Sequence, residues 1–192
     1  MNHNIYDWQT KLLWKDENFD LTNARTTAGV LPDLMLIPGT NIEISIFDGV
    51  NTTEGISSVK ELNHDYRQGT LIYPHVHWYP TVSGIGNVKW NFEYWARGGH
   101  DYSTMVTSGM LSVVSSVVGK GAWEMIKSNF EGLNLGDLAN IGTQIHFHFY
   151  RNPADDQDTY GSDAAVATLG WHYLTDMRGS DQISSKTPRQ AL

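Results

Sequence analysis

The chain has 192 residues, 40% of them hydrophobic, and a formal net charge of −8, which suits one domain with a sizeable core. It contains no cysteine, which excludes disulfides, thiolate metal sites and a cysteine nucleophile. Its few lysines and arginines form no basic stripe and no apolar run reaches the ~20 residues that span a bilayer, so we expect neither a nucleic-acid nor a membrane partner.

Residues 1–40 differ from the rest of the chain. Four large apolar residues there follow no sustained period: Trp8, Leu12, Leu13 and Trp14. Pro32 and Pro38 interrupt any long helix. We predict an extended N-terminal arm that packs over the domain or over a neighbouring subunit, with a short amphipathic helix as the alternative. The four apolar residues are candidates for an assembly interface.

From residue 41 the pattern changes to short alternating segments separated by turn residues. In the first of them Ile42, Ile44 and Ile46 alternate with their neighbours, which is a strand signal. Strands are expected at 42–47, 56–62, 70–79, 88–97, 102–118, 122–130, 143–151 and 164–174, with Gly109 as a candidate β-bulge. We predict an all-β, jelly-roll-like sandwich of about eight strands over residues 41–176, followed by a polar tail over 177–192.

Two of these strands carry paired histidines. His75 and His77 lie two residues apart, as do His146 and His148, so each pair shares one face of its strand. Imidazole is a common metal ligand, and these four side chains are the candidate metal ligands. The interpretation we favour is a packing surface in which the imidazoles hydrogen-bond across strands, so neither a metal nor another cofactor is predicted.

Gly69, followed by five residues and then His75 and His77, matches the opening of the cupin motif. A cupin then requires a glutamate where Thr81 and Val82 stand, and the second cupin motif is missing. A cupin-like metal-dependent enzyme that uses His75 and His77 is therefore an alternative rather than the main hypothesis.

Other chemical signals are weak. The acidic loop 153–163 fits an EF-hand poorly, so a solvated turn is expected there. No nucleophile elbow and no distinctive carboxylate pair occur, and we predict that the protein is not an enzyme. Five tryptophans that fall in expected strands are assigned to the core, with sugar stacking as the alternative: Trp78, Trp90, Trp95, Trp123 and Trp171.

Several separated segments resemble, in order, a family of tailed-phage and prophage virion proteins. The first is the Pro-His-x-His-Trp strand at 74–78, followed by Gly-Asn-Val-x-Trp-x-x-Glu-Tyr at 86–94. The Asp-Thr-Tyr turn at 158–160 and the segment 171–180, which closes on Gly-Ser, also fit. The similarity covers about residues 42–180 and reaches the arm only loosely, through residues 6–8.

The resemblance implies a structural virion component, made in the cytoplasm of a bacterial host, without catalytic residues to carry over. A capsid decoration (cement) protein or a head–tail or fibre-associated subunit is expected. Its partners would be copies of itself, in a homotrimer or other ring, and virion proteins such as the major capsid protein. A carbohydrate-binding module of a host-recognition fibre is the remaining alternative.

Overall fold

The computed structural model describes residues 13–19, 21, 30–50, 52–98 and 106–176. Trp8, Leu12 and the predicted tail 177–192 lie outside these residues. The described chain contains a short 3-10 helix at Gly136–Leu138 and ten strands. The strands are β1 Leu13–Asn18, β2 Asp33–Leu36, β3 Glu43–Phe47, β4 Glu54–Glu61, β5 Ile72–Pro80, β6 Asn87–Arg97, β7 Val106–Ser116, β8 Ile126–Asn129, β9 Gln144–Arg151 and β10 Ala164–Thr175.

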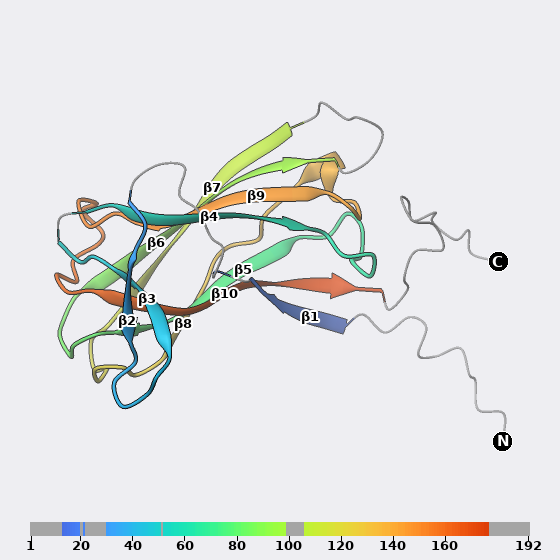
Figure 1. Cartoon of the computed structure of the whole chain (residues 1–192). Helices are drawn as coiled ribbons and strands as arrows, with labels where there is room; N and C mark the ends of the chain where they lie inside the picture. Colours follow the sequence, from blue (N-terminus) through green and yellow to red (C-terminus); the bar gives the residue numbers. More distant parts are fainter. Residues whose placement is uncertain (1–12, 20, 22–29, 51, 99–105, 177–192) are drawn as a thin grey trace, which may run out of the picture.

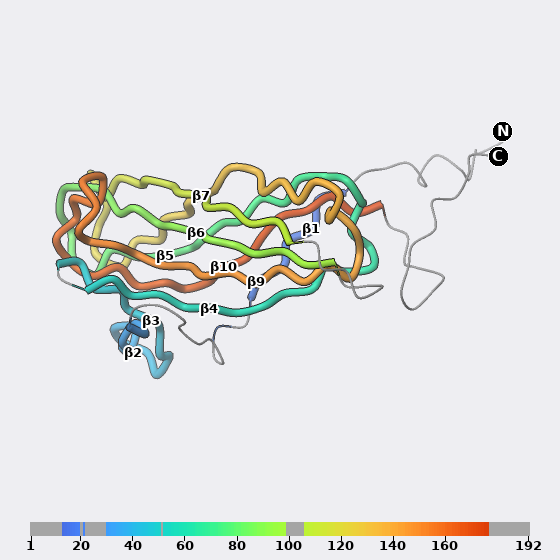
Figure 2. The backbone as a smooth tube through the Cα atoms, turned by 90° about the horizontal axis from the view of Figure 1, so that it is seen from above, coloured from blue at the N-terminus to red at the C-terminus, as the bar shows by residue number. Residues whose placement is uncertain are grey.

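The strands form two antiparallel sheets that face each other (Figures 1 and 2). Sheet A has the order β2-β3-β10-β5-β8, with β1 also paired to β10, and sheet B has the order β4-β9-β6-β7. When β3 to β10 are counted as strands one to eight, the two orders become 1-8-3-6 and 2-7-4-5. This is the double Greek key of a jelly roll, and it confirms the predicted all-β sandwich.

The core between the sheets is aromatic. Sheet A contributes Trp78 and sheet B contributes Trp90 and Phe92, all of them fully buried. The Trp90 ring stacks on Phe149 with centroids 5.0 Å apart, and the Phe92 ring stacks on Phe147 at 5.2 Å. Every second side chain of these strands is apolar and inward, which is why the alternation in the sequence located them.

Two of the five tryptophans assigned to the core lie elsewhere. Trp95 is partly exposed on the outer face of sheet B, opposite His146 of β9. Trp123 precedes β8, has a φ of 61° and lies 6.1 Å from the Tyr79 ring on the outer face of sheet A. The sequence prediction was wrong for these two because it assigned whole strands to the core rather than one face of each.

The segment before residue 41 adds two strands to sheet A. β1 pairs with the C-terminal half of β10, so residues 13–18 of the predicted arm extend the domain's own sheet. Phe19 follows, donates its backbone N–H to the Leu169 carbonyl and places its ring in the core against Trp171. Val30 then bridges to Glu54 at the edge of sheet B. The described part of the arm therefore contacts both sheets.

β2 is the outermost strand of sheet A and pairs only with β3 among the described residues. Figures 1 and 2 show that the β2–β3 hairpin projects from the body of the sandwich. All four residues of β2 are exposed, including Leu34, Met35 and Leu36. Neither face of this apolar strand is covered.

Two sequence expectations about the strands need correction. The register between β6 and β7 is continuous, so Gly109 is not a bulge; a Cβ there would lie 2.7 Å from the Tyr94 hydroxyl. The irregularity in sheet A lies instead between Val166 and Thr168 of β10. The strand expected at 122–130 is limited to β8, because the chain turns at Trp123 before it enters the sheet.

The acidic loop is not simply a solvated turn. Asp158 is buried and accepts two hydrogen bonds from Arg151, at 2.9 and 2.8 Å. Arg151 is fully buried and directs its remaining N–H groups to three backbone carbonyls, those of Phe47, Tyr160 and Ser162. This buried ion pair holds the loop to the sandwich, and Asp155 near the start of the loop makes a second, partly buried ion pair with Lys89 of β6.

Candidate functional site

The outer face of sheet A carries a group of imidazoles. In β5 the residues Val76 and Trp78 point into the core, so His75 and His77 point outward. On the neighbouring strand β10, His172 also points outward because Trp171 and Tyr173 point inward. We call these three histidines and Asp16 of β1 the imidazole cluster.

The rings of the imidazole cluster are in contact. His75 stacks on His172 with centroids 4.4 Å apart and an interplanar angle of 13°. His77 meets His75 edge to face at 5.2 Å. The residue opposite His75 on β10 is Gly170, and the atoms nearest to where its Cβ would lie belong to Glu17 and Asn18 of β1, so β1 packs closely over this position. Stacked imidazoles of this kind pack well when they are neutral and repel when both are protonated.

His75 is the most unusual member. It is 0% exposed, and neither of its ring nitrogens has a hydrogen-bond partner among the described residues. Burial lowers the pKa of His75 to about 4, although nearby Asp16 acts in the opposite direction. Burial and the charge of Lys127 also lower the pKa of His77. The expectation that the histidines hydrogen-bond across strands was therefore wrong for His75, which makes ring contacts instead.

Asp16 brings a carboxylate to this group. Its Oδ1 atom lies 3.6 Å from His75 Nε2 and 3.8 Å from His172 Nδ1. One ligand atom from each of these three residues lies within 4.8 Å of the other two. On the other side of the His172 ring, the Lys127 ammonium lies 3.0 Å from Nε2. Two nitrogens and an oxygen thus surround a small common space, with a cation nearby.

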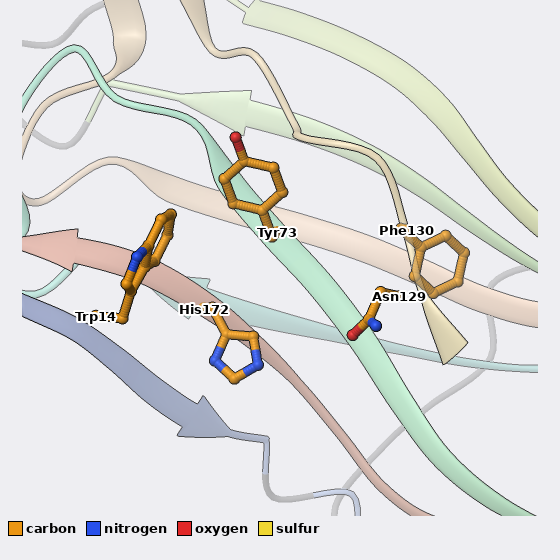
Figure 3. A pocket seen from close by; sticks show the side chains of 5 residues that line it. All are labelled: Trp14, Tyr73, Asn129, Phe130 and His172. Atoms are coloured by element: carbon orange, nitrogen blue, oxygen red, sulfur yellow. The ribbon is translucent and has the colours of Figure 1, made fainter. Parts of the chain in front are cut away.

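A groove of about 400 Å³ lies beside the cluster. Figure 3 shows its lining side chains, which come from four parts of sheet A: Trp14, Tyr73, Asn129, Phe130 and His172. The Trp14 and Tyr73 rings meet at 71°, with centroids 5.5 Å apart. A sugar ring stacks on aromatic faces that lie side by side, whereas these two rings form a corner.

The second histidine pair lies on the opposite side of the molecule. His146 and His148 point outward from sheet B, so the four predicted candidates do not converge on one site. His148 is buried under Tyr150, with the two rings stacked at 4.9 Å, and its Nδ1 atom lies 3.9 Å from a Glu93 oxygen. Burial lowers the pKa of His148 while Glu93 opposes the shift.

The structure also changes which residues belong together in sheet A. His75 shares its space with His172 and Asp16, whereas the sequence paired it with His77. Asp16 was missed because it lies in the arm, where no period indicated a strand. The outward position of His172 could have been inferred from Trp171, His172 and Tyr173, since alternation alone separates them onto two faces.

The two assembly candidates within the described residues, Leu13 and Trp14, are exposed on β1. Trp14 packs against Tyr73 of its own sheet. No helix among the described residues is long and apolar enough to cross a membrane. A scan against models of known protein families and a search of curated proteins found no match to this chain.

Proposed function

We propose that the protein is a structural subunit of a tailed-phage particle that works by assembly rather than by catalysis. A capsid decoration protein, or a head–tail or fibre-associated subunit, is the role we favour. It would be made in the bacterial cytoplasm and incorporated in the virion through contacts with its own copies and with proteins such as the major capsid protein. The ordered sequence resemblance over about residues 42–180 is one support for this proposal.

The observation that carries the proposal is the exposed strand β2. Leu34, Met35 and Leu36 are all exposed in one short strand, and Leu34 reaches 66%. A strand with a free backbone edge and apolar side chains on both faces promotes association unless it is covered. The occupant that we propose is a second copy of this chain.

The geometry of β2 suits such self-association. Leu34 and Leu36 share one face, while Met35 lies on the other with the outward side chain of Ile44. The exposed side chains Val30, Leu31 and Ile42 adjoin the strand. A neighbour that adds a strand along β2 gains backbone hydrogen bonds and covers both faces, and a cyclic arrangement of such contacts gives a trimer or another ring.

The proposal is tested by measuring the mass of the purified chain in solution by light scattering after size-exclusion chromatography. We expect an oligomer of at least three copies for the unchanged protein. The double variant Leu34→Lys and Leu36→Lys is expected to shift it toward the monomer, because it places charges on the apolar face of β2.

The matched control is Ile85→Lys, at a side chain that is 81% exposed in the loop after β5, far from β2 in sequence. This variant should leave the mass unchanged. A monomeric unchanged protein at high concentration, or an oligomer that survives the double variant, would contradict the role of β2. Detection of the chain in purified particles tests the virion assignment separately.

The alternatives are less well supported. A carbohydrate-binding module favours coplanar exposed aromatic rings, and the two rings in the groove lie at 71° to each other. A cupin-like enzyme built on His75 and His77 is disfavoured because His75 shares a candidate ligand group with His172 and Asp16 instead.

A further inference from the structure

We propose that Asp16, His75 and His172 form a site for a divalent transition-metal ion of the zinc type, which fastens β1 to β5 and β10 of the same sheet. The inference is independent of the assembly role, since it concerns the isolated chain. It differs from the sequence-based metal candidates in two of its three residues.

The donor set fits such an ion. Two imidazole nitrogens and one carboxylate oxygen are ligands that zinc, cobalt and nickel accept, and three protein ligands leave a fourth position for water. The oxygen–nitrogen distances of 3.6 and 3.8 Å compare with roughly 3.3 Å between ligand atoms around a tetrahedral ion with bonds of about 2.0–2.1 Å. Because the nitrogen lone pairs lie in the ring planes and the two rings are nearly parallel, the partly exposed His172 ring has to turn out of the stack before both nitrogens face one ion, and Asp16 has to move closer.

His75 supplies an independent reason to expect a ligand. Its imidazole is fully buried, and both ring nitrogens lack hydrogen-bond partners among the described residues. An unpaired buried polar group costs about 1–3 kcal/mol, so such groups usually have a partner. Its Nε2 atom is directed to the space beside Asp16, where an ion would satisfy it.

Lys127 gives the site a competing cation. Its ammonium donates to His172 Nε2, which requires the ring proton to be on Nδ1, the atom that would bind the ion. Coordination through Nδ1 moves the ring proton to Nε2 and leaves the ring neutral. Nε2 then no longer accepts a hydrogen bond, and the exposed Lys127 side chain turns into solvent. Lys127 therefore opposes ion binding in two ways: its positive charge repels the ion, and its hydrogen bond favours the tautomer of His172 that cannot coordinate the ion through Nδ1.

The three ligands come from strands far apart in the sequence: β1, β5 and β10. Of these, β1 is a six-residue strand paired along only one edge among the described residues. An ion held by all three ligands would join β1 through coordinate bonds to β5 and β10 in the middle of the sheet. The expected consequence is local: amides of residues 13–18 become better protected from hydrogen exchange when the ion binds.

The site is tested by titrating the metal-free protein with Zn(II) in a calorimeter and with Co(II) in a visible spectrometer. We expect one ion per chain and the absorption bands of tetrahedral Co(II). Asp16→Asn and His172→Gln should each weaken binding by about 100-fold or more, since even outer contacts of metal ligands change affinity about 10- to 100-fold. Lys127→Met should bind more tightly than the unchanged protein.

The matched control is His146→Gln, which removes an exposed imidazole from β9 of the opposite sheet and should leave binding unchanged. Asp16→Asn is the central variant because its side chain is 49% exposed and its loss should not prevent folding. The proposal is overturned if neither the unchanged protein nor Lys127→Met binds one ion. It is also overturned if Asp16→Asn retains full affinity, or if zinc leaves the exchange of residues 13–18 unaltered.

Discussion

At the scale of single residues, the two most constrained groups are the buried Arg151–Asp158 pair and the buried imidazoles. Arg151 uses its N–H donors on one carboxylate and three carbonyls, so its charge is fully compensated. His75 and His148 avoid a buried charge in another way. Burial lowers the pKa of each, so each ring is neutral and stacks on a neighbouring ring. The first arrangement depends on its partner and the second depends on pH.

Removal of Asp158 tests the buried pair. Asp158→Ala leaves the Arg151 charge buried without its carboxylate, and we expect it to lower the free energy of unfolding by about 3–5 kcal/mol. Asp155→Ala in the same loop removes the partly buried ion pair with Lys89 and the hydrogen bond from the Gln157 N–H, and should cost about 1 kcal/mol. Urea denaturation of both variants measures the difference. Equal losses would mean that the buried pair has no special role.

His148 predicts a dependence of stability on acidity. Its pKa is lowered in the folded state, mainly by burial and against the opposing charge of Glu93, so the unfolded chain binds a proton that the folded chain does not. The contribution of His148 to stability is therefore fully present above the pKa that this ring has in the unfolded chain. It is lost as the pH falls from there toward the lower pKa of the folded chain. Between about pH 7.5 and about pH 5.5, His148→Gln should lose less stability than the unchanged protein, by up to about 1 kcal/mol.

The measurement is denaturant unfolding at the two pH values in the presence of a chelator. His75 and His77 contribute in the same direction in both proteins, because the pKa of each is lowered as well. The comparison with His148→Gln therefore isolates the contribution of the His148 ring to the stability that is lost on acidification. His146→Gln serves as the control, since the His146 side chain is exposed on the same strand. A larger acid loss in His148→Gln than in the unchanged protein would refute the assignment.

At the scale of elements, the sequence was most informative where one face of a strand is buried. The runs around His75 and His146 alternate strictly, and the structure has strands β5 and β9 there. It was least informative for β1 and β2. Both faces of β2 are exposed, and β1 is mostly exposed, so neither strand requires an alternating apolar pattern. Edge strands are formed by backbone pairing, which leaves little trace in the side-chain types.

Phe19 is the contact that connects the arm to the core. Its ring lies 4.7 Å from Trp171 and 4.9 Å from Phe147, so it touches both sheets. Phe19→Ala should lower the free energy of unfolding by about 3 kcal/mol through the lost burial and the cavity. It should also increase hydrogen exchange in residues 13–18. The control Leu13→Ala removes an exposed side chain of β1 and should cost less than about 0.5 kcal/mol. Unchanged exchange in Phe19→Ala would show that β1 is held by pairing alone.

At the scale of the whole molecule, alternation and turn spacing were sufficient to predict a two-sheet sandwich of about eight strands. The strand order was not predictable, because it depends on pairings between distant segments such as β3 with β10. The candidate site was predicted in part. His75 was identified from its strand, but Asp16 and His172 join it only when β1 and β10 are paired in register.

The net charge of −8 should oppose assembly through β2 by repulsion between the copies. Two copies that meet along this strand bring together acidic side chains such as Asp33 and Glu43, while the contact itself is apolar. Raising the ionic strength from about 0.1 M to about 1 M shortens the screening length from about 10 Å to about 3 Å and removes most of this repulsion. We therefore expect association, measured by sedimentation velocity, to tighten several-fold with added sodium chloride.

Asp33→Asn should reduce that dependence, because it removes one of the repelling charges. Association that weakens with salt would instead indicate an interface built from complementary ion pairs, and β2 would then not be its main contact.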